Sequence, residues 1–179
     1  MNRAAITTAA AVTAILLAGC GTATSSTPEA APNGQAGEAA PAAGKAMADA
    51  SSAFTAVSAA VPSAKLGTTV TAESDPNHML GRPHGYTSKI TFTDARIPAE
   101  QTEGRENDDL ELGGSIEIFP TAAEAKSRAD YIQAASKAMP TLAEYDYLHG
   151  ATLVRVSRLL TPAQAADYEK AAAKLPDRY

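Results

Sequence analysis

Residues 86–94 read YTSKITFTD, and this stretch decides the fold because its side chains alternate in character. One side of an extended chain would carry the more apolar set: Tyr86, Ser88, Ile90 and Phe92. The other side would carry a polar set: Thr87, Lys89, Thr91 and Thr93. The alternation predicts a β-strand with one face in the core and the other in water.

Further strands are expected on both sides of this one. A glycine pair opens a strand over residues 115–119, and two more strands over 145–148 and 151–157 flank a two-residue turn at 149–150. Strands that come in consecutive pairs favour antiparallel pairing over parallel crossovers. Residues 64–74 leave two possibilities open, an edge strand or irregular chain.

Helices are expected before, between and after the strand pairs. Apolar residues recur at helical spacing over residues 45–60. Thr121 with Glu124, and Thr161 with Gln164, have the spacing of a capping box, which predicts two more helix starts. The sequence therefore predicts an α+β domain in the order helix-β-β-helix-β-β-helix. We expect two layers, a four-stranded antiparallel sheet with its helices on one face.

Composition narrows the classes of protein. The chain has 179 residues and a formal charge of −5, which favours one domain with a tail. Without a basic surplus to neutralise phosphates, nucleic acid is not an expected partner. The single cysteine, Cys20, excludes an internal disulfide, so the core alone must stabilise the fold. We expect a monomer.

The first twenty residues have the features of an export signal. Arg3 precedes an uncharged, mostly apolar run over residues 4–18, which is shorter than the roughly 20 residues that span a bilayer. The motif Leu17-Ala18-Gly19-Cys20 resembles the lipobox of bacterial lipoprotein precursors. The resemblance implies a diacylglyceryl group on the Cys20 sulfur and cleavage just before this residue.

These features define three segments. Residues 1–19 are expected to be a signal peptide, residues 20–44 a lipidated tether rich in Ala, Gly, Pro, Ser and Thr, and residues 45–179 a single domain. The expected location is the extracytoplasmic face of the cell membrane, with Cys20 as the lipid anchor.

The densest polar cluster lies in residues 75–86, DPNHMLGRPHGY. Together with the strand that follows and the lipobox, this segment is similar to small uncharacterised lipoproteins of actinobacteria, which imply no activity. The possible ligand-binding residues are Asp75, Asn77, His78, Arg82, His84 and Tyr86. They could bind an anion or a metal, or Asp75 and Asn77 could simply cap a turn. The two histidines match no standard ligand spacing, so neither a metal nor a cofactor is expected.

Two further groups of residues have a functional and a plain interpretation. An acidic run could bind calcium or form a solvated loop, and the loop is favoured because the EF-hand pattern is missing. Its members are Glu100, Glu103, Glu106, Asp108, Asp109 and Glu111. Tyr145 and Tyr147 could form a ligand-binding strip, but such a pair more often lies at the edge of a core.

No catalytic motif is present, and no catalytic residue is assigned. We therefore expect a binding or interaction module for an envelope protein or a small ligand. The alternative is a hydrolase that acts on envelope material with His84 or His78 as its base. A histidine within hydrogen-bonding reach of Asp75 and a hydroxyl would favour the hydrolase.

Overall fold

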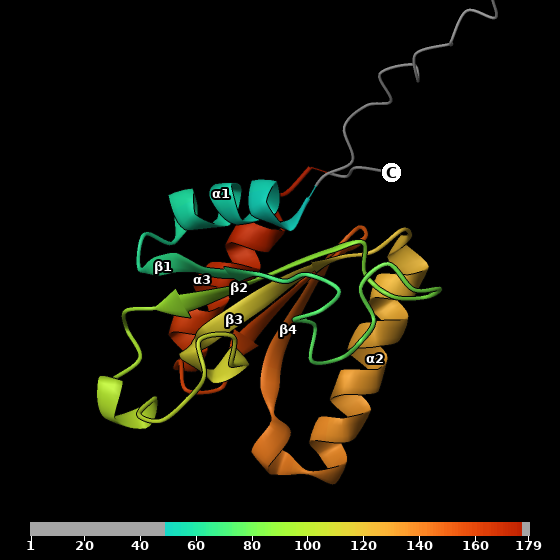
Figure 1. Ribbon diagram of the computed structural model, residues 1–179. Coiled ribbons are helices and arrows are strands. Elements are labelled where there is room, and N and C mark those ends of the chain that lie inside the picture. Colours follow the sequence, from blue (N-terminus) through green and yellow to red (C-terminus); the bar gives the residue numbers. More distant parts are fainter. Residues whose placement is uncertain (1–48, 177–179) are drawn as a thin grey trace, which may run out of the picture. The chain divides into compact units, whose positions relative to one another are not determined.

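The computed structural model describes residues 49–176, so the expected signal peptide and the whole tether, including Cys20, lie outside the described residues. The described part contains one antiparallel sheet of five strands in the order β1-β2-β3-β5-β4 (Figure 1). The strands are β1 Ala64–Thr69, β2 Ser88–Asp94, β3 Gly113–Ile118, β4 Glu144–His149 and β5 Thr152–Ser157. The α+β class and the antiparallel pairing are confirmed.

Three α-helices and three short 3-10 helices complete the described domain. They are α1 Ala50–Ala60, α2 Ala122–Ala138, α3 Pro162–Ala172, η1 Ala99–Gln101, η2 Leu110–Leu112 and η3 Pro140–Leu142. Thr121 and Thr161 cap α2 and α3 as predicted. Asp49 caps α1, so this helix begins at Ala50 rather than at residue 45. Within residues 49–176, no helix has the length and apolar character needed to cross a bilayer.

The predicted number of strands is wrong, because β1 adds a fifth strand at the edge of the sheet. It pairs with β2 from Ala64 to Leu66, and the register then shifts before Thr69. The shift breaks the alternation of side chains, and most of the strand is exposed. The period-two signal that identified β2 is therefore missing from residues 64–74.

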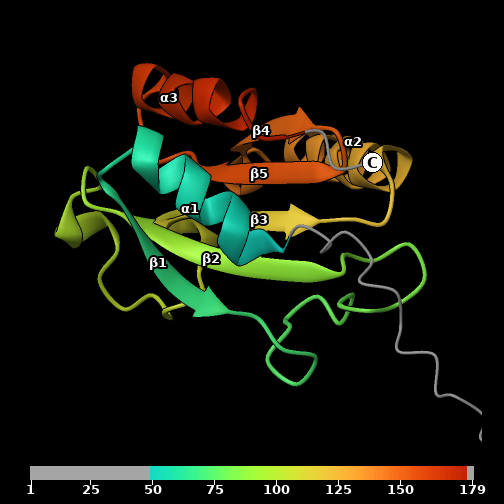
Figure 2. The same ribbon diagram turned by 90° about the horizontal axis from the view of Figure 1, so that it is seen from above.

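The prediction of two layers is also wrong, because helices cover both faces of the sheet (Figure 2). On one face, α1 and α3 pack on alternate residues of the central strands, such as Ile90 and Val154. On the other face, α2 packs on Leu153. Lys89 and Thr91 on the same face are buried beside the loops 75–86 and 105–112, although the sequence pattern placed them in water.

Glycine at the start of β3 allows a close packing of aromatic rings. A Cβ at Gly114 would lie 2.2 Å from the Arg155 carbonyl oxygen and 2.5 Å from the Phe92 ring. Phe92 itself is stacked between Phe54 and Tyr168, with ring centroids 5.9 and 5.2 Å away. The glycine pair thus marks a strand that lies directly against the main core.

Candidate functional site

Asp75 holds the 75–86 loop together from inside. Its buried carboxylate accepts hydrogen bonds from the backbone N–H groups of Asn77 (3.1 Å), Met79 (2.7 Å) and Leu80 (2.9 Å). It also accepts one from the hydroxyl of Tyr86, which is fully buried. Burial alone would raise the pKa of Asp75, but these donors outweigh it and keep the pKa below its ordinary value. The Asp75–Tyr86 pair therefore has a structural role.

The structure does not bring the six predicted ligand-binding residues together. Arg82 is exposed, and so are His78 and His84, whose backbones are left-handed with φ of 51° and 62°. His84 Nδ1 lies 3.4 Å from Glu124 Oε1, yet the His84 side chain is 88% exposed. Asn77 donates from Nδ2 to the Tyr86 hydroxyl at 3.3 Å. Asn77 and His84 border the same hollow, which is formed mainly by α2.

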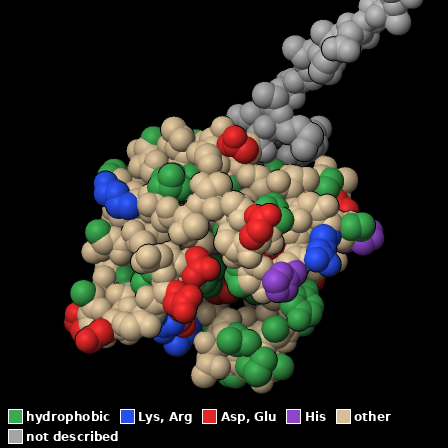
Figure 3. All heavy atoms as spheres, viewed as in Figure 1, with side chains coloured by type: hydrophobic (Ala, Val, Ile, Leu, Met, Phe, Trp, Pro, Cys, Tyr) green, Lys and Arg blue, Asp and Glu red, His purple; other side chains and the backbone are tan. Residues whose placement is uncertain are grey.

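Three adjoining hollows of about 630, 510 and 390 Å³ form a groove between α2 and the loops 75–86 and 105–112. We call this the α2 groove. Asn77 lines all three hollows, and the residues that line two of them include Arg128, Tyr131 and Arg155. Figure 3 shows this hollowed face, with acidic side chains beside the hollow and hydrophobic side chains below it.

One wall of the α2 groove is apolar and exposed. Tyr131, Met139 and Leu142 are 67%, 52% and 50% exposed, and all three line the groove. Met139 lies just beyond the end of α2 at Ala138, where the chain turns into η3. Large apolar side chains that gather at one hollow are a feature of binding sites.

The floor of the groove is a buried cluster of charges on the sheet. Glu117 is fully buried, and its Oε1 lies 3.3 Å from Lys89 Nζ and 3.0 Å from Arg155 Nη1. Burial would raise the pKa of Glu117, but Arg155, Lys89 and Arg128 together hold it below the ordinary value. Burial lowers the pKa of Lys89, and Glu117 offsets part of that effect.

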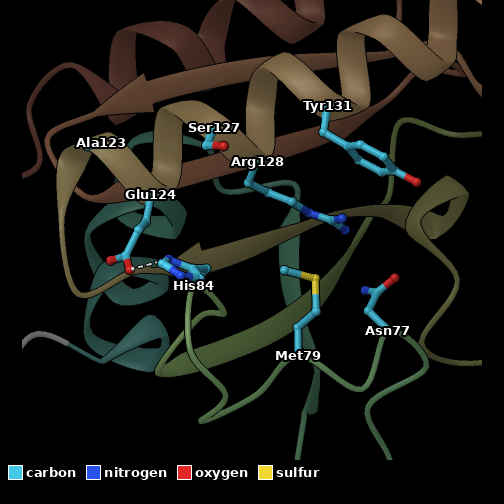
Figure 4. Close-up of a pocket in the computed structure, with 8 residues that line it drawn as sticks. All are labelled: Asn77, Met79, His84, Ala123, Glu124, Ser127, Arg128 and Tyr131. Carbon is cyan, nitrogen blue, oxygen red and sulfur yellow. Dashed lines mark ion pairs between the residues drawn. The ribbon is translucent and has the colours of Figure 1, made fainter. Parts of the chain in front are cut away.

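Arg128 connects α2 to this floor. Its side chain is 10% exposed, and its Nε lies 3.4 Å from Glu117 Oε2 without forming a hydrogen bond to any residue in the described part. The guanidinium carbon is 5.9 Å from the centroid of the Tyr131 ring. Figure 4 shows the side chain reaching from α2 toward Met79 and Asn77. The end of the guanidinium therefore faces the groove, whereas Nε faces Glu117.

A carboxyl pair lies at the side of the floor. Arg155 binds Glu144 with two hydrogen bonds, of 2.6 and 2.8 Å. Asp146 lies beside Glu144 and accepts a hydrogen bond from Gln133 of α2. Burial, with the neighbouring Glu144 carboxylate, raises the pKa of Asp146 to about 7. Asp146 therefore changes its charge near neutral pH.

The raised pKa of Asp146 predicts a pH dependence of stability. The ordinary pKa of an aspartate is 3.8, whereas the pKa of Asp146 in the native state is about 7. Between these two pH values the unfolded state loses the proton and the native state keeps it. The free energy of unfolding therefore falls as the pH rises across this range. Each pKa unit of difference between the folded and unfolded states changes the free energy of unfolding by about 1.4 kcal/mol. Solvent screening reduces this value for a group that is not fully buried. We expect Asp146→Asn to stabilise the protein by about 2 kcal/mol at pH 8 and by little at pH 4.5.

Urea unfolding at the two pH values measures this effect. The control is Asp130→Asn, since Asp130 is an exposed carboxylate on α2 that forms an ion pair with Lys126. An equal effect of Asp146→Asn at both pH values would contradict the raised pKa.

The other two candidate groups have structural surroundings. Arg105 forms ion pairs with Asp109 (2.9 Å) and with Glu111 in the acidic run. Among residues 49–176, no group of three or more His, Cys, Asp or Glu is arranged to hold a metal ion. Tyr145 and Tyr147 pack against the core beneath α3. Within the acidic run, Glu106 and Asp108 border a further hollow next to Thr68, and Asp109 and Glu111 line the α2 groove.

Sequence reasoning identified Asn77 and His84 but missed the residues of α2 and of the sheet that form most of the α2 groove. A signal was present, because a charged residue alternates with apolar ones on three strands: Lys89, Glu117 and Arg155. The alternation in β2 predicts a water-facing side for Lys89, and nothing within one strand shows that the loops 75–86 and 105–112 lie over that side. The exposure of Tyr131 carried no sequence signal.

Comparison with known proteins adds no function. No protein-family model, curated protein or solved structure matches this chain. Function must therefore be inferred from the site itself, since a fold alone does not determine an activity.

Proposed function

We propose that this protein is a lipid-anchored binding module on the extracytoplasmic face of the cell membrane, and that the α2 groove is its ligand site. The anchor rests on the lipobox ending at Cys20. The observation that carries the binding site is the convergence of exposed Tyr131, Met139 and Leu142 on a hollow whose floor is charged. An apolar wall with a few polar groups is the usual composition of a ligand pocket.

A hydrolase has less support. Asp75 is occupied by three backbone N–H groups and Tyr86, so it cannot orient a histidine. His84 has a carboxylate neighbour in Glu124, but its ring forms no hydrogen bond to a hydroxyl in the described part. The hydroxyl of Thr121 donates to Glu124 at 2.9 Å, but this hydroxyl serves as the N-cap of α2 and accepts from the Glu124 backbone N–H. The contact is therefore explained by helix capping, and it is made to Glu124 rather than to the histidine that would act as the base.

The anchor predicts that Cys20→Ser moves the full chain out of the membrane fraction. Because Cys20 precedes the described domain by a long segment, we expect the circular dichroism spectrum to stay unchanged. Cell fractionation with a tagged chain measures the distribution, and Ser25→Ala is the control. A Cys20→Ser chain that still sediments with membranes would contradict the anchor.

The groove predicts that the full chain, isolated from its own cells, carries a small molecule that mass spectrometry detects. Ser127→Trp fills the hollow beside Arg128 and should remove the molecule. Ala134→Trp adds the same bulk on an exposed part of α2 outside the groove and should retain it. Equal amounts in both variants would contradict the groove as the site.

A further inference from the structure

Resting on the proposed function, we infer that the ligand of the α2 groove is an amphipathic anion, an apolar chain or ring that carries one carboxylate or phosphate group. Its acidic head would lie on the floor between Arg128 and Ser115. Its apolar part would lie along Tyr131, Met139 and Leu142.

The balance of charge on the floor favours an anion. Three cationic side chains, Lys89, Arg128 and Arg155, share the buried carboxylates of Glu117 and Glu144. Arg155 already forms two hydrogen bonds with Glu144, which leaves Glu117 to neutralise the other two. An ionic group that is buried without hydrogen bonds is costly, and an incoming carboxylate or phosphate would supply them.

Arg128 has the geometry to receive that anion. Its Nε is buried without a hydrogen-bond partner in the described part, and its guanidinium projects into the groove (Figure 4). A planar guanidinium binds carboxylate or phosphate through two parallel hydrogen bonds. The Tyr131 ring, 5.9 Å from the guanidinium carbon, would cover one side of this pair.

Ser115 supplies an independent observation. Its side chain is 1% exposed, and its Oγ has no hydrogen-bond partner among the described residues. It lines the same hollow as Lys89 and Arg155. A buried hydroxyl left unpaired is costly, so an unpaired donor that borders a hollow indicates a bound polar group.

The apolar wall has the dimensions of a short chain. Tyr131 lies on α2 and Met139 follows its last residue, and the distance between their positions along the helix axis is about 12 Å at about 1.5 Å per residue. Leu142 extends the wall into η3. Acidic residues also line the groove, with Glu106, Asp108 and Asp109 in the hollow that contains Ser115. They disfavour a ligand that carries more than one acidic group.

Isothermal titration calorimetry on the full chain carrying Cys20→Ser, in buffer without detergent, tests this inference. The probes are decanoate, decyl phosphate, decyltrimethylammonium, decanol, acetate and inorganic phosphate. We expect decanoate or decyl phosphate to bind at least about 10-fold more tightly than the cation and the alcohol, which is about 1.4 kcal/mol. The stronger of the two anions identifies the head group. Acetate and inorganic phosphate alone should bind weakly, because they lack the apolar part.

Variants separate the head-group contact from the fold. Arg128→Gln should weaken the anion at least about 10-fold, and Ser115→Ala should weaken it less. Lys126→Gln removes the same charge from an exposed position on α2 and should leave the affinity unchanged. Arg128→Lys keeps the charge but not the paired donors, so it should restore only part of the affinity. Circular dichroism confirms that each variant is folded.

Several results would overturn the inference. If decanol binds as tightly as decanoate, the groove is apolar and has no anion site. If decyltrimethylammonium binds more tightly than the two anions, the groove selects a cation instead. Equal affinities of Arg128→Gln and Lys126→Gln would remove Arg128 from the site. If no decyl compound binds but Ser127→Trp still removes the co-isolated molecule, the inferred ligand class is wrong, and the proposal that the α2 groove is a ligand site is kept. If Ser127→Trp changes nothing, the proposed site itself is wrong.

Discussion

Replacing Glu117 with glutamine is expected to destabilise the protein by about 3–5 kcal/mol, the usual cost of removing one partner from a buried charge cluster. Glu117 is fully buried and lies within 3.4 Å of Lys89, Arg128 and Arg155. The glutamine has a similar shape, so packing changes little. Three cations would then share one remaining carboxylate, Glu144, in a region that water reaches poorly.

Urea unfolding monitored by circular dichroism measures this loss. Asp130→Asn is the matched control, since it breaks an exposed ion pair with Lys126 and should change stability by less than about 1 kcal/mol. In Glu117→Gln, the further change Arg128→Gln should recover part of the loss, because it removes one of the unpaired cations. A single variant as stable as the wild type would show that Glu117 does not neutralise the floor.

Replacing Asp75 with alanine is expected to cost about 3 kcal/mol or more, since hydrogen bonds to a charged group contribute about 1.5–3 kcal/mol each. The loss of a simple helix or turn cap costs only about 1 kcal/mol. We expect a larger loss of stability at Asp75 than at a simple cap, because its carboxylate accepts hydrogen bonds from three backbone N–H groups and from the buried Tyr86 hydroxyl. All four donors would lose their acceptor together.

Hydrogen exchange locates this effect as well as measuring it. The amides of Met79 and Leu80 should lose protection in Asp75→Ala, because both donate to this carboxylate. Arg82→Ala lies in the same loop but is exposed, and a change there should stay within about 0.5 kcal/mol. Equal effects of the two substitutions would reduce Asp75 to an ordinary turn residue.

Local chemistry accounts for the parts of the fold that the sequence predicts well. Alternation identifies β2, and the capping pairs that begin with Thr121 and Thr161 identify the first turns of α2 and α3. Each of these signals depends on neighbours a few residues away along the chain. They are readable without knowledge of any other element.

The α2 groove could not be predicted in the same way, because it depends on elements that are distant in the sequence. Arg128 and Glu117 meet only when α2 lies on the sheet face opposite α1 and α3. One amphipathic strand cannot show whether its polar face will be covered, so Lys89 was assigned to water. The sequence shows that residues 75–86 are the densest polar cluster. It cannot divide them into buried Asp75 and exposed Arg82, because this division depends on the buried position of the Tyr86 side chain.

The strand order has a consequence for a chain that emerges from a ribosome or a translocation channel with its N-terminus first. β1, β2 and β3 can pair as soon as Ile118 is available, but the other side of β3 must wait for β5. Until Ser157 has emerged, the backbone N–H and C=O groups on that side remain open to pairing with another chain. The β4–β5 hairpin closes this gap in a single step, so the period between the appearance of Ile118 and of Ser157 is when the growing chain most needs protection from self-association.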